Sequence, residues 1–337
     1  MTAQPFDDFR ALLTNLPEPD AFAMTLARKR QVELTKPKGS LGKLEEIAVW
    51  YAGWKGGEKP IVTRPLVAVF AGNHGVTDEN VSPFPRAVTQ KMVENFAAGG
   101  AAINQICVAY DLGLKIFDLA LDYPTMDITK DAAMDERGAA ATMAFGMESI
   151  AGGTDLLCLG EMGIGNTTIA AALSLALFGG EAEDWVGPGT GATGEIYKRK
   201  VDAVKKACDL HNDHLDDPFE IMRRLGGREI AAIVGAILAA RMEKIPVILD
   251  GFVVTAAAAI LHKAHPQALD HCLIGHVSAE PGHKKILEII KKKPLLDLNM
   301  RLGEATGAAL AAGIVKAAVL THAQMATFSE ADMSDIQ

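Results

Sequence analysis

Residues 155–165 read DLLCLGEMGIG, a short apolar run that passes at once into glycines around a single acid. An apolar run that ends in glycine is typical of a buried strand leading into a tight turn. The next residues, NTTIAAALSLALFGG (166–180), are apolar and rich in Ala and Leu, which predicts a buried helix. A buried strand, a glycine-rich turn and a helix form the repeating unit of a parallel α/β sheet.

The same alternation continues in both directions along the chain. Further strand-like runs are LVAVFAG (66–72), KIFDLAL (115–121), PVILDG (246–251) and CLIGH (272–276). Helical stretches are predicted over 85–110, 167–178, 195–214, 228–242, 251–264 and 282–292. This order predicts an α/β fold with a mostly parallel sheet and helices on both faces.

The two ends of the chain lack strand signals. Residues 20–34 have helical spacing, KPKGSLGKLEEIAVWYAGW (36–54) reads as a turn into a second helix, and 301–324 is an Ala-rich helix. We therefore predict a large α/β domain over 61–300. Residues 1–60 and 301–337 are predicted to form a small discontinuous helical domain.

Composition narrows the class of protein. The chain of 337 residues is 49% hydrophobic but only 6% aromatic, and it has a formal charge of −9. Like charges nowhere form a block of five, which argues against general nucleic-acid binding. The polar GIGNTT segment (163–168) argues against a membrane span over 162–180. Four cysteines without a CxxC pair and an acidic N-terminus predict a cytoplasmic protein with reduced, buried thiols.

Polar or glycine-rich residues follow four of the predicted strands. These segments are AGNHGV (71–76), GEMGIGNTT (160–168), DGFVVT (250–255) and HVSAEPGH (276–283). Since ligands of open parallel sheets bind beyond the carboxyl ends of the strands, the pattern predicts a pocket at that edge.

Two glycine clusters suit an anion. In GEMGIGNTT the turn either binds an anion or allows tight packing, with Asn166, Thr167 or Thr168 as a possible helix cap and Glu161 as a candidate acid. GPGTG (187–191) precedes a helix that carries Lys200, a combination that suits a phosphate monoester. An ordinary loop before a solvated helix face explains the second cluster equally well.

Other candidates leave alternatives open. Ser278 either binds phosphate or caps a turn, and His276 and His283 lack a third metal ligand at a familiar spacing. Glu304, amid small apolar residues, is either a general base with a raised pKa or a charge that favours a helix N-terminus. Asp250 ends a strand as in diphosphate-sugar loops, but it stands alone, without the second acid that holds magnesium.

Taken together, these segments resemble the nicotinate-nucleotide–dimethylbenzimidazole phosphoribosyltransferase family. The matching stretches, in the family's order, are 36–48, 71–85, 96–106, 160–168, 187–191, 225–236, 247–253, 276–283 and 302–310. The resemblance implies a Rossmann-like large domain, a small helical domain from both termini, a homodimer, and nicotinate mononucleotide and a benzimidazole base as substrates. No cofactor, metal, nucleic acid or membrane is implied.

The resemblance also implies roles for single residues. Glu304 corresponds to the catalytic base, and Ser82 and Gln90 correspond to positions that line the benzimidazole pocket. Four residues correspond to positions around the nucleotide's phosphate and ribose: Glu161, Gly163, Lys200 and Ser278. The chain departs from the family's usual pattern at Asn73, Asn80, Pro83 and Ala305.

Two rival functions remain at this point. One is a phosphoribosyltransferase that uses the diphosphate sugar with magnesium. The other is a nucleotide-sensing protein that binds without releasing nicotinate.

Overall fold

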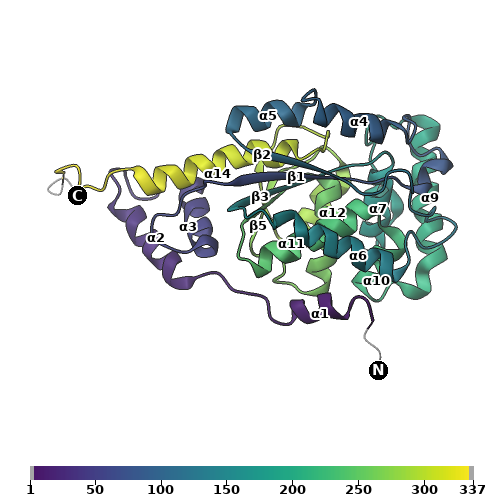
Figure 1. Cartoon of the computed structure of the whole chain (residues 1–337), viewed down its shortest axis with the longest axis horizontal. Helices are drawn as coiled ribbons and strands as arrows, with labels where there is room; N and C mark the ends of the chain where they lie inside the picture. Colours follow the sequence, from purple (N-terminus) through teal and green to yellow (C-terminus); the bar gives the residue numbers. More distant parts are fainter. Residues whose placement is uncertain (1–3, 334–337) are drawn as a thin grey trace.

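The computed structural model describes residues 4–333, which contain a six-stranded sheet with helices on both faces (Figure 1). The strand order is β2-β1-β3-β4-β5-β6, and every neighbouring pair is parallel. The strands are β1 (Pro65–Ala71), β2 (Gly113–Asp118), β3 (Leu156–Met162), β4 (Val247–Leu249), β5 (Cys272–His276) and β6 (Pro294–Leu296). The predicted α/β class is confirmed.

Fourteen α-helices occur within the described residues 4–333. The first seven are α1 (Asp7–Leu13), α2 (Ala21–Glu33), α3 (Lys43–Lys55), α4 (Val88–Ala97), α5 (Ala102–Tyr110), α6 (Glu136–Met147) and α7 (Asn166–Phe178). The others are α8 (Ala182–Trp185), α9 (Gly194–His211), α10 (Pro218–Leu225), α11 (Arg228–Met242), α12 (Phe252–Ala264), α13 (Pro281–Ile289) and α14 (Thr306–Gln324).

The prediction of one helix over 85–110 is wrong. The segment forms α4 and α5, and the break lies at Gly99, whose φ of +78° is not helical. The Asn104 side chain then accepts a hydrogen bond from the Ala101 N–H and starts α5. A left-handed glycine is a common way to end a helix.

The central strands are buried on both faces and feed two cores. Val67 and Val69 of β1 pack with α5 and α14, whereas Ala68 and Phe70 pack with the helices of the other face. Figure 1 shows α4, α5 and α14 above the sheet and α6, α7, α10, α11 and α12 below it. Burial on both sides explains why these strands read as continuous apolar runs.

Helix α14 joins the sheet to the end of the molecule. It is the one helix of the described residues that is long and apolar enough to cross a membrane, yet 56% of its apolar window is buried inside the fold. Its first half lies on the sheet, and its second half runs outward beside α2 and α3 (Figure 1). It is therefore a core helix in this fold.

The terminal segments pack in two places. Arg30 of α2 donates hydrogen bonds to the carbonyl oxygens of His322, Ala323 and Met325, which ties α2 to the end of α14. The Phe6 ring, next to α1, instead stacks on Phe219 of α10, with 5.5 Å between ring centroids. The division into domains 61–300 and 1–60 plus 301–337 stays a prediction, and its residues 1–3 and 334–337 lie outside the described chain.

Candidate active site

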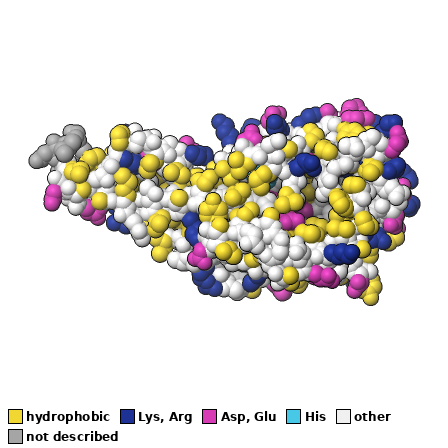
Figure 2. Space-filling view, turned by 90° about the horizontal axis from the view of Figure 1, so that it is seen from above, with side chains coloured by type: hydrophobic (Ala, Val, Ile, Leu, Met, Phe, Trp, Pro, Cys, Tyr) yellow, Lys and Arg dark blue, Asp and Glu magenta, His cyan; other side chains and the backbone are white. Residues whose placement is uncertain are grey.

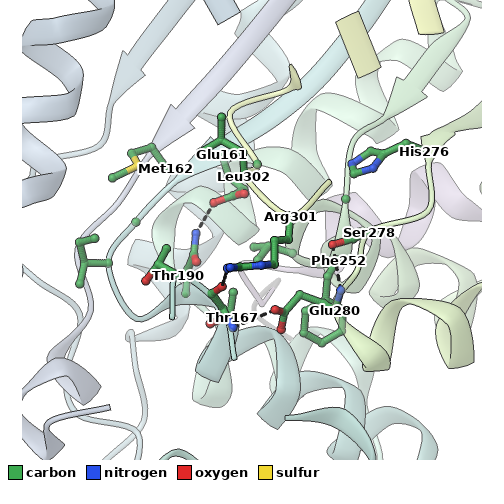
Figure 3. A pocket seen from close by; sticks show the side chains of 17 residues that line it. Glu161, Met162, Thr167, Thr190, Phe252, His276, Ser278, Glu280, Arg301 and Leu302 are labelled. Atoms are coloured by element: carbon green, nitrogen blue, oxygen red, sulfur yellow. Dashed lines mark hydrogen bonds between the residues drawn. The ribbon is translucent and has the colours of Figure 1, made fainter. Parts of the chain in front are cut away.

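A cavity opens at the carboxyl ends of β3, β4 and β5 (Figure 3). Its walls come from the loops that follow these strands, from the glycine loop 187–191 and from residues 301–303. Three of the predicted site residues line it: Glu161, Gly163 and Ser278. The pocket lies at the edge of the sheet where the sequence predicts it.

A second cavity adjoins the first, and the two share a wall formed by Gly163, Ile164, Asn166 and Thr167. Ser82 and Lys200 line this second cavity. Among the described residues, Gln90 and Glu304 line neither cavity. Gln90 is exposed on α4, and its amide donates to Glu94 Oε1 at 3.3 Å.

The glycine-rich turn after β3 needs glycine because it passes close to other backbone. A Cβ at Gly163 would lie 2.7 Å from the carbonyl oxygen of Gly72, next to β1. Gly165, with φ +89°, is the N-cap of α7, so the prediction that Asn166, Thr167 or Thr168 caps this helix is wrong. The turn thus brings the backbone at the start of α7 to the cavity, as anion sites at helix N-termini require.

Glu161 is buried near the end of β3. Asn166 Nδ2 donates to Glu161 Oε2, and the other oxygen, Oε1, lies next to Gly303, where an added Cβ would be only 2.6 Å away. Burial, together with the charges of Asp250 and Glu229, raises the pKa of Glu161 to about 8. At neutral pH this carboxyl group is mostly protonated and can donate a hydrogen bond to a ligand.

The glycine loop 187–191 is held by one buried acid and one buried base. Lys200 Nζ donates to the Gly187 carbonyl oxygen at 2.7 Å and to Thr167 Oγ1 at 3.0 Å. Glu280 Oε1 accepts from the Gly189 N–H at 2.8 Å. Burial lowers the pKa of Lys200 to about 8 and raises that of Glu280. Lys200 therefore lies between the loop and the start of α7, where a phosphate would meet both.

Neighbouring basic residues of α9 do not enter the cavities as Lys200 does. Lys198 pairs with Glu195, and Arg199 Nε donates to the Asn80 carbonyl oxygen at 3.0 Å. Arg301, from the far side of the pocket, donates to the Gly189 carbonyl oxygen instead (Figure 3).

Ser278 is fixed from both sides of its backbone. Its N–H donates to His283 Nδ1 at 2.8 Å, and its Oγ accepts from the Glu280 N–H at 3.2 Å. His283 Nδ1 is thus an acceptor, so its Nε2 carries the proton and donates to Thr255 Oγ1 at 3.0 Å. Burial lowers the pKa of His283 to about 3, which agrees with a neutral ring. His283 is a structural support for the serine.

Glu304 lies in the turn before α14 and is only 6% exposed. Its φ is +60°, between Gly303 at +86° and Ala305 at +64°. Non-glycine residues in this conformation cost about 1–2 kcal/mol each and persist where the surroundings hold them. Burial raises the pKa of Glu304 to about 7. A strained, buried carboxyl group that titrates near neutrality is well suited to general base catalysis.

Three buried residues of this edge were not recognised from the sequence as a group. His74 Nε2 lies 2.7 Å from Glu229 Oε1, and both side chains are fully buried. Gly72 and Gly227 make room for them, since a Cβ at either position would collide with the pair. Asp250, fully buried after β4, accepts from the Ala308 N–H of α14 at 2.9 Å. The glycines in AGNHG and LGGRE are the signal that could have found the pair.

A family model described as phosphoribosyltransferase matches residues 16–333 of the chain. A protein of Rhizobium leguminosarum bv. trifolii (strain WSM2304), named nicotinate-nucleotide–dimethylbenzimidazole phosphoribosyltransferase, is 72% identical over 98% of each chain. A protein of the same name from Brucella canis (strain ATCC 23365 / NCTC 10854 / RM-666) is 71% identical over 98% of this chain and 97% of its own.

A solved structure shares the fold at lower identity. The crystal structure of a protein of that name from Thermus thermophilus superposes with a TM-score of 0.86. It is 40% identical, and the match covers 94% of this chain and 99% of the other. The likeness therefore extends over most of the chain.

Proposed function

The chain belongs to the nicotinate-nucleotide–dimethylbenzimidazole phosphoribosyltransferase family, and on that premise we propose that Glu304 is the base of its reaction. The enzyme transfers the phosphoribosyl group of nicotinate mononucleotide to 5,6-dimethylbenzimidazole or a related base. The products are α-ribazole 5′-phosphate and nicotinate, and the former serves cobalamin nucleotide-loop assembly.

The bond changes define what a base must do. The bond from C1′ of the ribose to the pyridinium nitrogen breaks, and its electron pair leaves with nicotinate. The bare ring nitrogen of the benzimidazole bonds to C1′ from the opposite face, which gives the α-linked product. Positive charge then develops on the benzimidazole, and Glu304 takes the proton from its other nitrogen.

One observation carries the assignment: Glu304 is a buried carboxyl group, held in a left-handed turn, whose pKa burial raises to about 7. A carboxyl group with an ordinary pKa is a weaker base toward the developing cation. A base matched in pKa and position contributes about 10²–10⁴-fold to the rate.

Two glycine segments and Lys200 suit the nucleotide's phosphate. Lys200 Nζ lies between the 187–191 loop and Thr167 at the start of α7. Gly163 and Ser278 line the adjoining cavity, where the ribose would lie. The protonated Glu161 can donate a hydrogen bond to a ribose hydroxyl group or phosphate oxygen. We assign these four residues to nucleotide binding.

We place the acceptor base beside the nucleotide, against the loop that carries Ser82. Ser82 lines the second cavity with Val81 and Pro83, and the exposed Phe84 follows on the same loop. Gln90 would contact the base only after its amide leaves Glu94. The base site is therefore less fully formed than the nucleotide site, and it is also where the sequence departs from the family's usual pattern.

The remaining assignments concern the localisation, oligomeric state and cofactor requirement of the enzyme. We propose that it is a cytoplasmic homodimer that acts on small molecules and needs no cofactor or metal, since no diphosphate leaves. Exposed apolar side chains on α5 and α14, among them Val108 and Leu320, support a second copy as the occupant of that face (Figure 2). Light scattering at micromolar concentration tests the dimer, and a monomer would contradict it.

One assay tests the function and its rivals. Purified enzyme is mixed with nicotinate mononucleotide and 5,6-dimethylbenzimidazole in EDTA, and the products are identified by mass. We expect α-ribazole 5′-phosphate and nicotinate in equal amounts. Binding without nicotinate release would favour a sensor, and dependence on the diphosphate sugar and magnesium would favour the other transferase class.

The same assay tests the base. Glu304→Gln should keep the fold and nucleotide binding but lower kcat by about 10²–10⁴-fold, because the amide does not accept the proton. Near-normal turnover of this variant at saturating substrates would reject Glu304 as the base.

A further inference from the structure

The first turn of α14 lies directly against the sheet, with glycines at the contacts. A Cβ at Gly160 of β3 would collide with the Ala305 nitrogen. A Cβ at Gly275 of β5 would lie 2.8 Å from Ala308 Cα, and one at Gly307 would enter the His276 ring. The helix start that follows Glu304 therefore packs closely on β3 and β5, and glycines allow the close approach.

Asp250 lies in the middle of this contact between α14 and the sheet. It follows β4, between the two strands that carry Gly160 and Gly275, and it is fully buried. Its Oδ1 accepts from the Ala308 N–H at 2.9 Å, and the nearby backbone N–H groups of Gly307 and Ala305 also lower the pKa of its carboxyl group. A side chain from the sheet thus satisfies one of the free N–H groups at the start of α14, which a residue next to the helix in the chain usually does.

These contacts hold the backbone on both sides of Glu304. The Glu304 N–H donates to the Glu161 carbonyl oxygen at 3.2 Å. The next N–H group, that of Ala305, lies close enough to the Asp250 carboxyl group to lower its pKa. The backbone before Glu304 is therefore bonded to β3, and the first turn after it is bonded to Asp250 through Ala308. These contacts hold two non-glycine residues at positive φ.

We propose that Asp250 is a positioning residue for the base: it orients the Glu304 carboxylate by bonding the backbone that follows it. The proposal rests on the assignment of Glu304 as the base. Asp250 acts through the helix start and does not touch the substrates. Three other titratable groups lie at this contact: Glu161 on β3, His276, whose Nε2 is 3.6 Å from Asp250 Oδ1, and Cys158, whose thiol donates to the Ala308 carbonyl oxygen at 3.7 Å.

Asp250→Asn tests the proposal. The amide accepts at one oxygen and directs its own N–H groups at backbone donors, so the helix start must shift. Because misplacing a catalytic group by about 1 Å can cost about 10²-fold, we expect kcat to fall about 10–100-fold. The KM for nicotinate mononucleotide should stay close to that of the unaltered enzyme, because the glycine segments and Lys200 are untouched.

Asp217→Asn is the matched control. Asp217 Oδ1 accepts from the Phe219 and Glu220 N–H groups at the start of α10, a cap of the same chemistry on a helix that contributes to neither cavity. It should lower the unfolding midpoint and leave kcat unchanged. If kcat falls equally in both variants, the loss in Asp250→Asn comes from general destabilisation of the fold, and the proposal is wrong.

A second pair of variants moves the helix start without changing a charge. Gly275→Ala forces Ala308 away from β5, and we expect it to lower kcat with little change in KM. Gly146→Ala is its control, since the added Cβ would collide with the Ala232 carbonyl oxygen in the α6–α11 contact. This pair gives the answer if Asp250→Asn does not fold.

Glu304→Gln belongs in the same series. If it turns over normally, the assignment of the base fails. If it is inactive while Asp250→Asn and Gly275→Ala keep full kcat, the base stands and the positioning role is wrong. Loss of kcat in all three, with nucleotide binding retained, supports both.

Discussion

The acidic side chains at the two ends of the parallel strands lie in opposite environments. At the amino end, the half-buried Asp155 accepts from the Thr63 N–H, the Thr63 hydroxyl group and the Arg64 N–H, at 2.6–2.9 Å. At the carboxyl end, Glu161, Asp250 and Glu304 are all buried, and burial raises their pKa values to about 8, 7 and 7. The amino end is built for stability, whereas the carboxyl end retains groups that exchange protons near neutral pH.

The raised pKa values at the carboxyl end make the stability of the fold depend on pH. An acid whose pKa is higher in the folded state binds more protons folded than unfolded between the two pKa values, so stability falls as pH rises through that window. The window runs from about 4.5 to about 7–8 for Glu161 and Glu304, and from about 3.8 to about 7 for Asp250. The site is thus least favourable to folding at the pH where Glu304 is ionised and active.

The largest expected effect concerns pH. Because Glu304 acts as a base only when ionised and its pKa is about 7, kcat should fall about tenfold per pH unit below 7, to about one hundredth at pH 5. Turnover at saturating substrates across pH 5–9 measures it, with circular dichroism as the control for folding. A flat profile down to pH 5 would remove the functional contrast between the two ends.

Lys200 gives the next largest effect. Lys200→Met keeps the buried stem but removes the charge that faces the glycine loop, so the KM for nicotinate mononucleotide should rise about 10–100-fold, as expected for a lost charge-assisted hydrogen bond. Since burial lowers the pKa of Lys200 to about 8, the unaltered enzyme should also bind the nucleotide more weakly above pH 8. Lys198→Met, on the exposed face of α9, is the control; a similar rise there would reject the special place of Lys200.

The sequence predicts the buried central strands but misses some of the smaller or less apolar elements. The central strands were predicted well because burial on both faces makes them continuous apolar runs. β6 was missed because it has three half-buried residues and begins with Pro294. α6 was missed because it packs through small residues, as at Gly146, and not through an apolar stripe.

For the site, the sequence located segments but not contacts. Strand-end motifs identified Glu161, Gly163 and Ser278, which the fold brings to one cavity. The burial of Lys200 had a readable signal, because it shares a helix face with Val204 and Ala207, four and seven positions on. The bond from Asp250 to Ala308 spans 58 residues, and such pairing follows only from the packed fold.

The amino end supplies the third prediction. Asp155→Asn weakens three hydrogen bonds and should lower the free energy of unfolding by about 1–2 kcal/mol. Chemical denaturation measures the loss, and kcat should be unchanged because the residue lies at the opposite end of β3 from the cavity. A large fall in kcat would show that the two ends are coupled and would break the comparison.

The smallest expected effect concerns non-glycine residues with positive φ, one at each end of the strands. Lys244, exposed before β4, has φ +51°, and Ala305, buried at the site, has φ +64°. Lys244→Gly should stabilise the fold by about 0.5 kcal/mol, because relief of about 1–2 kcal/mol of strain exceeds the entropy cost of glycine. Ala305→Gly relieves the same strain but loses a methyl group packed against Gly160, about 0.8 kcal/mol, so its gain should be smaller or absent. If the two variants gain the same free energy of unfolding in denaturation experiments, the packing of Ala305 against Gly160 does not stabilise the start of α14. The positive φ of Ala305 would then have no structural explanation.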